Sequence, residues 1–479
     1  MKKIFILLFL TAVSFGCSDN LERLPLTTIG EPAFWKTSND AINGVNGVYN
    51  VLADNNMYRD FMRHSDALSD NAYSQYSFNY YLEISEGKSY DASSVLPKSI
   101  WTKAYEGIVR ANTVIEKVPT IEMDAILKTR ILGEAHFLRA LFYFHLTNLY
   151  GNVPLVLKHQ TVEESLVPRD PKATVVAQII TDLSTAANSL PTSYTASDVG
   201  RVTKGAALAL KSRVFLYNKM YSEAATASKE VMAMSYSLLP TKDFGAQFLP
   251  DKENNAQESI FEVQFLGNTG ITGAGSAFNG SSGALRNFGN SYTPLKNLVD
   301  SFEPGDIRLA ASVLQPGETF AGTTYDPQNS PTKLAFKKSI IPDANITGDG
   351  GANFVVIRYA EILLNYAEAQ NEVSGPDATV YDAINKIRTR AGLAALPQTF
   401  SKETLREAIK KERRAEFVLE GHRYFDLLRY GATDMKAAME RVTSVVGHVR
   451  LYNERLLLWP VPQVETTINP NLLPQNSGW

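Results

Sequence analysis

The chain has little cysteine, little tryptophan and no long apolar run beyond its N-terminal segment. Its 479 residues include one Cys and four Trp, against 22 Tyr and 23 Phe. A single thiol excludes a disulfide framework, so the fold must be stabilised by burial of a core. After the N-terminal segment no stretch reaches about 18 uninterrupted apolar residues, and the pattern therefore predicts no transmembrane helix.

The charge balance excludes other classes of protein. The formal net charge is −3, and 44% of the residues are apolar against 20% charged. A nucleic-acid-binding protein would usually carry a basic stripe, which is absent here. The apolar content is high enough for a large core, and we therefore expect an ordered globular body.

Signatures of catalysis and of metal binding are also missing. The sequence has six His and contains no H-E-x-x-H, no G-x-S-x-G and no phosphate-binding loop. His136 and His145 are nine residues apart, about 900° along a helix, so they point to opposite faces and cannot share a metal. We expect no metal, no cofactor and no catalytic residue.

The N-terminal segment reads as a lipoprotein signal peptide. Lys2 and Lys3 precede an apolar stretch at 4–15, which is too short to span a bilayer and ends at Gly16 and Cys17. The interpretation is a signal peptide at 1–16, a lipid on Cys17 and a polar tether at 17–31. Lipoprotein processing adds more than one acyl chain, enough for stable anchoring.

The remaining chain, 32–479, is predicted to be mainly α-helical. The strongest helical periodicity covers 123–150, where apolar side chains occur nearly all round and Gly151 ends the pattern. Short alanine-rich helices at 203–218 and 221–234 form a tetratricopeptide-like pair. We divide this body into an N-terminal helical part at 32–239, a glycine-rich insert of loops and small sheets at 240–353, and a C-terminal part at 354–479.

A second helical pair and a third helix are expected in the C-terminal part. VIRYAEILLNYAEAQNEV is followed by ATVYDAINKIRTRAGL, and then by a helix that begins with Ser401 as N-cap. The tail from 456 onward is punctuated by proline and is predicted to be non-helical. One further loop, 54–96, interrupts the N-terminal part and is rich in Asp, Asn, Ser and Tyr.

Several motifs, in order, resemble the SusD/RagB family over nearly the whole mature chain. They are GEAHFLRALFYFHLTNLYGNVPLV (133–156), RYAEILLNYAEAQNE (358–372), ERRAEFVLEGHRYFDLLRYG (412–431) and the closing WPVPQVETTINPNLLPQNSGW. The resemblance implies a superhelix of tetratricopeptide-like helical pairs whose inserted loops form the ligand face. It also implies a lipoprotein on the outer face of the outer membrane that captures a glycan for a SusC-like TonB-dependent transporter and acts as its lid.

The ligand face is expected in two loop regions without tryptophan. Sugar binding needs aromatic faces and side chains that bond hydroxyl groups. The four Trp (Trp35, Trp101, Trp459 and Trp479) fall in scaffold segments, so Tyr and Phe must supply the platform. The candidates are Asp66, Asp70, Asn71, Tyr73, Tyr76, Phe78, Tyr80, Tyr81, Phe278, Asn279, Arg286, Asn287, Phe288 and Tyr292. The alternation of Tyr76, Phe78 and Tyr80 also fits a half-buried strand.

Three other functions remain open from the sequence. Some relatives of this kind bind peptides, and the missing Trp platform keeps that alternative. An α-helical glycoside hydrolase would need two acids about 5–10 Å apart in an open cleft. A purely structural scaffold would have no pocket. The acids and arginines of the motifs are instead interpreted as structural ion pairs, with Arg413/Glu416 and Glu420/Arg423 at three-residue steps. They are Glu361, Glu368, Arg413, Arg414, Glu416, Glu420, Arg423 and Asp426.

Overall fold

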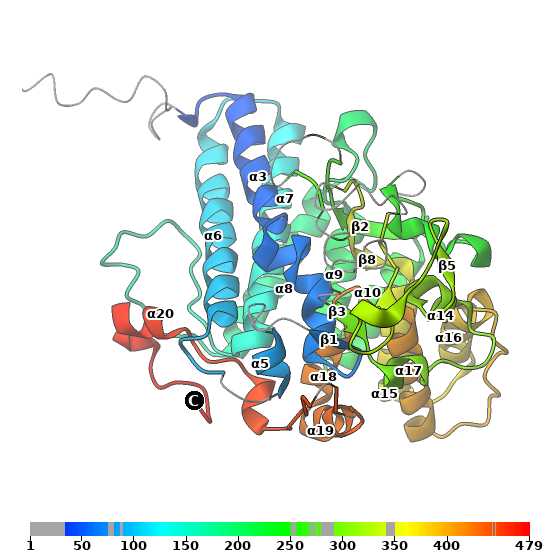
Figure 1. The fold of residues 1–479 in the computed structure, drawn as a ribbon. Helices are drawn as coiled ribbons and strands as arrows, with labels where there is room; N and C mark the ends of the chain where they lie inside the picture. Colours follow the sequence, from blue (N-terminus) through cyan, green and yellow to red (C-terminus); the bar gives the residue numbers. More distant parts are fainter. Residues whose placement is uncertain are drawn as a thin grey trace, which may run out of the picture.

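The computed structural model places the helices of 38–150 on one side of the molecule and the short strands, together with the C-terminal helices of 359–416, on the other (Figure 1). The residues that the structure describes are 34–74, 81–86, 90–250, 255–267, 269, 274–276, 278, 292–341, 350–442, 444–445 and 447–479. The predicted mainly α-helical class is confirmed.

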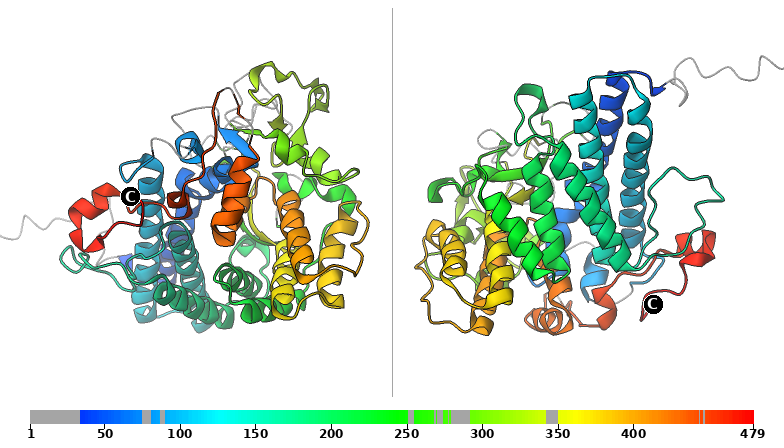
Figure 2. Two further views of the ribbon diagram at one scale, coloured as in Figure 1. Left: turned by 90° about the horizontal axis from the view of Figure 1, so that it is seen from below. Right: turned by 180° about the vertical axis from the view of Figure 1, so that it is seen from behind.

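The long helices pack as neighbours in chain order, α6 against α7, α7 against α8, and α9 against α10. Their bounds are α3 (Ser38–Leu52), α6 (Val95–Lys117), α7 (Ala125–Tyr150), α8 (Lys172–Ser189), α9 (Lys204–Tyr217), α10 (Tyr221–Met232), α15 (Tyr359–Ser374), α16 (Ala378–Arg390) and α17 (Lys402–Glu416). Figure 2 shows the same helices from behind and from below. Both predicted helical pairs, α9 with α10 and α15 with α16, are confirmed.

Helix α7 is the centre of the N-terminal part. Every residue from Phe137 to Tyr150 is buried, as the all-round apolar pattern predicts. Gly107 of α6 faces the ring of Phe142, where an added Cβ would lie 2.2 Å from the ring, so a glycine is required for this close helix contact. Gly151 ends α7 with a φ of +72°, the expected stop.

The shorter elements fill the space between the helices. Their bounds are α4 (Phe61–His64), α5 (Tyr81–Glu86), α13 (Lys296–Val299), α14 (Ile307–Ser312), α18 (Arg423–Tyr430), α19 (Ala432–Glu440) and α20 (Gln463–Ile468). The strands are β1 (Ala72–Ser74), β2 (Ser259–Val263), β3 (Tyr292–Pro294), β4 (Val313–Leu314), β5 (Thr319–Phe320), β6 (Thr323–Thr324), β7 (Ala335–Phe336) and β8 (Phe354–Arg358). In the described residues each sheet is an antiparallel pair: β1–β3, β2–β8, β4–β7 and β5–β6.

Some local predictions were wrong. The tail was predicted to be non-helical, yet α20 forms after Pro462, whose fixed φ suits a helix start. At the start of α3 the sequence also offers Ser38 as an N-cap, but Thr37 caps the helix and forms a capping box with Asp40. The 54–96 region holds more regular structure than its composition predicts, because α4, α5 and β1 are stabilised by contacts with distant segments.

The described helices include none that is both long and apolar enough to cross a membrane. Residues 1–33, with the predicted signal peptide, Cys17 and most of the tether, lie outside the described residues.

Candidate functional site

Two of the predicted ligand segments meet in one small sheet. Strands β1 and β3 are antiparallel neighbours, and Ser74 stands opposite Tyr292 in the register. Ser74 directly precedes segment 75–80 in the sequence, and Tyr292 directly follows segment 279–291. These segments hold the candidates Tyr76, Phe78, Tyr80, Asn279, Arg286, Asn287 and Phe288, all of which lie outside the described residues.

Beneath this sheet, Asp70 is bound by three arginines. Its carboxylate accepts a hydrogen bond of 2.8 Å from Arg423 Nε and lies 3.3 Å from Arg414 and 3.0 Å from Arg441. Burial alone would raise the pKa of Asp70, but the guanidinium groups of Arg423 and Arg414 outweigh it and hold this pKa well below its usual value. Asp70 thus ties β1 to the C-terminal helices.

Asp66 and Asn71 bond to the chain itself. Asp66 Oδ2 accepts hydrogen bonds from the backbone N–H of Leu419 at 2.9 Å and from Asn71 Nδ2 at 3.3 Å, and Arg414 Nε donates to Asn71 Oδ1 at 2.8 Å. Burial raises the pKa of Asp66 to about 6. Because Asp66, Asp70 and Asn71 are all 0% exposed, the expectation that they bond ligand hydroxyls is corrected: they are interior groups that hold the base of the loops.

The described aromatic candidates are buried as well. The rings of His64 and Tyr292 are stacked with centroids 3.6 Å apart, and Tyr81 meets Tyr292 edge-on at 5.5 Å. Phe278 lies under the guanidinium of Arg63 at 4.5 Å. Tyr73 packs in a small cluster with neighbours that include Leu82 and Leu295. The expectation that Tyr73, Tyr81, Phe278 and Tyr292 form an open platform is corrected in the same way, since each is at most 5% exposed.

The charged residues of the C-terminal motifs form a buried ion-pair network, as predicted. Arg358 is its centre and donates to Glu258, Glu416 and Glu420 at 2.8, 2.5 and 2.6 Å. Burial would raise the pKa of Glu416, but Arg390 and Arg358 lower it well below its usual value. Glu416 is therefore held in its charged form by its guanidinium partners.

The pairing within that network differs from the expected three-residue steps. Arg413 pairs with Asp426, and Arg423 pairs with Asp70. Glu416 and Glu420 turn to Arg358. The sequence analysis missed four partners in this network, because nothing in the local sequence shows which distant residues pair. These partners are Glu258, Arg308, Arg358 and Arg390.

The described motif acids offer no site for hydrolysis of a glycosidic bond. Glu361, Glu368 and Asp426 are bonded to Arg213, Arg429 and Arg413 and are at most 5% exposed. Within the described ranges no group of three or more His, Cys, Asp and Glu is arranged to hold a metal. His136 contacts Asp182 whereas His145 contacts Tyr58, on opposite sides of α7, as predicted.

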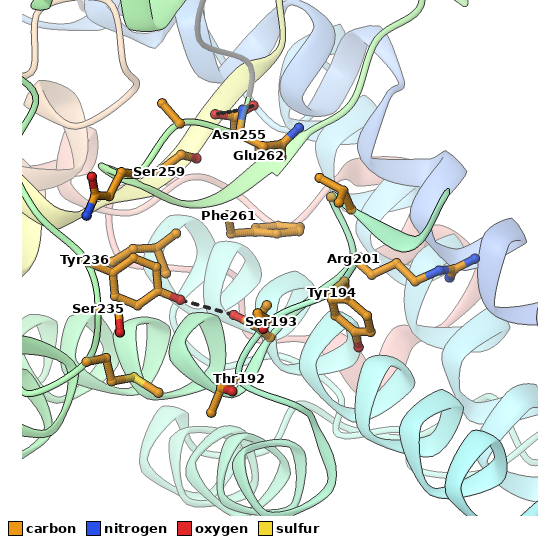
Figure 3. A pocket seen from close by; sticks show the side chains of 17 residues that line it. Thr192, Ser193, Tyr194, Arg201, Ser235, Tyr236, Asn255, Ser259, Phe261 and Glu262 are labelled. Atoms are coloured by element: carbon orange, nitrogen blue, oxygen red, sulfur yellow. Dashed lines mark hydrogen bonds between the residues drawn. The ribbon is translucent and has the colours of Figure 1, made fainter. Parts of the chain in front are cut away.

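A cavity of about 510 Å³ lies apart from these residues and was not predicted. It is lined by the α8–α9 connection, the segment after α10 and the start of β2. Figure 3 shows the aromatic residues Tyr194, Tyr236 and Phe261 around it. Its walls come from three separate loops without a motif, so the sequence carried no signal for it.

Two family models match the chain. One, described as the SusD family, matches residues 257–479, and one described as "Starch-binding associating with outer membrane" matches residues 36–216. The chain belongs to the SusD/RagB family. The helical pair α15–α16 and the C-terminal ion-pair network lie within the range 257–479.

Relatives of this SusD-family chain share its whole length. SusD-like protein P25 of Formosa agariphila is 27% identical over 99% of this chain and 98% of its own. A SusD-like carbohydrate binding protein from Bacteroides fragilis is 26% identical with a TM-score of 0.82, covering 92% of this chain and 100% of its own. A laminarin binding SusD-like protein is 27% identical with a TM-score of 0.77, covering 93% and 100%.

Proposed function

We propose that this protein is a lipid-anchored receptor on the outer face of the outer membrane, which captures an oligosaccharide and delivers it to a SusC-like TonB-dependent transporter as its lid. It acts by binding, without turnover of the glycan. The observation that carries this proposal is the β1–β3 sheet, which brings the bases of segments 75–80 and 279–291 together. The residues that border these two aromatic and amide-rich stretches, Ser74 and Tyr292, are therefore paired.

The rigid base supports this function. Asp70 and its arginines lock β1 against the helices, and the stacked His64 and Tyr292 lock the end of β3. Loops that carry binding residues on a rigid scaffold lose less conformational entropy when a ligand binds. The relatives named for carbohydrate and for laminarin binding support a glycan as the ligand.

The ligand contacts that we propose are on the two loops. The ring faces of Tyr76, Tyr80 and Phe288 stack on sugar C–H surfaces, while Asn279, Arg286 and Asn287 bond hydroxyl groups. The double variant Tyr76→Ala/Phe288→Ala should weaken binding of laminarihexaose, or of whichever neutral hexasaccharide binds, by at least about tenfold, or about 1.4 kcal/mol. The control, Tyr221→Ala at the start of α10, should leave the affinity unchanged. Unchanged affinity in the double variant would place the ligand elsewhere.

The transporter partnership has its own test. Affinity-tagged protein, extracted from its native outer membrane in mild detergent, should co-purify with a TonB-dependent barrel. We expect co-purification to persist in the glycan-binding double variant, because it removes only two side chains that we propose for the glycan. Recovery of the receptor alone from membranes that contain the barrel would contradict the lid role.

A further inference from the structure

We propose that the cavity near α8, α10 and β2 is a second binding site, which takes one or two residues of a neutral sugar. The proposal of this second site depends on the proposed function, in which the ligand is a glycan. The second site shares no residue with the loop site. Its volume of about 510 Å³ falls within the range of about 300–1,000 Å³ that is typical of small-molecule sites.

The cavity is held open by contacts outside it. Arg201, on the α8–α9 connection, pairs with Glu134 of α7 at 3.0 Å and with Asp198 at 2.7 Å. Tyr194 OH donates to the carbonyl of Val202 at 3.0 Å. Gly200 has a φ of +98°, and a Cβ there would lie 2.6 Å from the side chain of Gln264. This wall is therefore preformed and needs no ligand to shape it.

Three aromatic residues contribute to the lining of the cavity. The ring of Phe261 lies between those of Tyr236 and Tyr194 in Figure 3. Two of the rings are held by neighbouring side chains. Tyr236 OH is 3.4 Å from Thr203 Oγ1, and the guanidinium of Arg130 lies 5.8 Å from the centre of the Tyr194 ring. Fixed ring faces of this kind stack on the C–H surface of a pyranose.

Polar groups at the rim are available to a ligand. Among the described residues, no side-chain hydrogen bond is made by the hydroxyls of Thr192, Ser193 and Ser235 or by the amide of Gln257, and these four are exposed. Hydroxyls and an amide can both donate and accept, which matches the hydroxyl groups of a sugar. The cavity therefore offers both aromatic ring faces and side chains that can donate and accept hydrogen bonds, which sugar binding requires.

The charges favour a neutral ligand. Among the described lining residues there is one cation, Arg201, and one acid, Glu262. Arg201 is neutralised by its two ion pairs. Glu262 is 2% exposed and accepts hydrogen bonds from the backbone N–H of Asn255 at 3.0 Å and from Asn353 Nδ2 at 2.7 Å. Neither group is left to bind a phosphate, a carboxylate or the terminus of a peptide.

Two separate sites would give the receptor a functional advantage. A glycan chain that is long enough to reach both is held more tightly than by either alone, because the second contact becomes intramolecular. A short oligosaccharide would occupy each site independently. Weak binding of a glycan in the cavity would also keep this glycan at the protein while the loop site releases its own ligand.

The test is local protection of the cavity walls from hydrogen–deuterium exchange. The full-length protein in detergent is measured with and without laminarihexaose, maltohexaose, cellohexaose and xylohexaose. The variant Ser235→Trp fills the cavity from an exposed position, and Thr181→Trp, on the exposed face of α8, is the matched control. At least one of these probes should slow exchange in 192–203 and 234–237. The effect should be lost in Ser235→Trp, kept in Thr181→Trp, and kept in Tyr76→Ala/Phe288→Ala.

The outcomes separate this inference from the proposed function. Protection near β1 and β3 alone, in the wild type, would overturn the cavity site and leave the receptor function standing. Protection of 192–203 alone would support the cavity site and count against the loop site. Absence of protection at both places with all four probes, or cavity protection that survives in Ser235→Trp, would overturn the inference.

Discussion

Gly421 illustrates how one residue of a family motif is required by its surroundings. It stands in the segment LEGHR with a φ of +74°, and an ideal Cβ at this position would lie 2.6 Å from the carbonyl oxygen of Met62. Both the backbone conformation and the close approach of α4 exclude a side chain. The motif glycine therefore joins the C-terminal network to the base of the ligand loops.

The variant Gly421→Ala should lower the free energy of unfolding by about 3 kcal/mol or more, because strain in φ and a steric clash add together. The control is Gly322→Ala in the turn between β5 and β6, whose φ is +76° but whose added Cβ would meet nothing within 4 Å. It should cost only about 1 kcal/mol. Denaturant titration compares the two, and equal losses would contradict the role of the Met62 contact.

Asp66 should give the folded protein a distinct pH dependence. Burial raises its pKa to about 6 from the ordinary value of 3.8. The folded chain thus holds this proton more tightly than the unfolded chain. The resulting stabilisation is complete below pH 3.8 and is lost as the pH rises through about 6.

The variant Asp66→Asn removes that titration and can still accept the hydrogen bond from Leu419. Its stability relative to the wild type should therefore increase by about 1–3 kcal/mol between pH 4 and pH 7, since one pKa unit corresponds to about 1.4 kcal/mol. Denaturant titrations at both pH values measure this difference, in which the contributions of other groups cancel. A difference that is constant or that falls with pH would contradict the burial effect.

At the scale of elements, strand β8 and helix α17 are joined mainly through Arg358. It is 1% exposed and faces three carboxylates, so its removal leaves buried charge uncompensated. The variant Arg358→Met should cost about 3–5 kcal/mol of unfolding free energy. Lys386→Met, which removes the exposed pair with Asp382, should cost less than about 0.5 kcal/mol. Similar melting of both variants would show that the network is dispensable.

Helices were predictable wherever periodicity is strong, and contacts between distant segments were not. Helix α7 and the pairs α9–α10 and α15–α16 follow from apolar spacing and end signals within each segment. The three-residue pairs proposed for Arg413 and Arg423 failed because burial offered each arginine a better partner on another element. Asp66 and Asp70 looked like ligand groups because a buried acid and an exposed acid have the same local sequence.

Beside a smaller cluster that packs α10 against α15, α16 and α17, the described residues form one large core, which runs from Ala41 in α3 to Leu472 near the C-terminus. Trp101 and Trp459 are buried within it, as their scaffold positions predicted. The single cysteine excludes a disulfide within this core. Ligand recognition by the two loops is our proposal, and the sugar was implied by the family resemblance. The cavity could not be foreseen, because it exists only where three separate segments meet.

The anchor is tested at the level of the whole protein in its membrane. Cys17→Ala should move the protein from the membrane fraction to the soluble fraction without a change in its melting temperature, because Cys17 precedes every described residue. Ser18→Ala, next to it, is the control and should stay with the membrane. A Cys17→Ala protein that remains on the membrane would show that something other than a lipid on this thiol holds it there.

We propose above all that the protein binds a glycan and does not hydrolyse it. The most direct test is calorimetric titration of the chain from residue 18 onward, which retains every described residue, with plant, fungal and host-derived oligosaccharides and with peptides as a control set. Chromatography of the recovered ligand follows each titration. We predict binding to one class of glycan, with the glycan recovered intact. Hydrolysed glycan, or binding to peptides alone, would contradict the account.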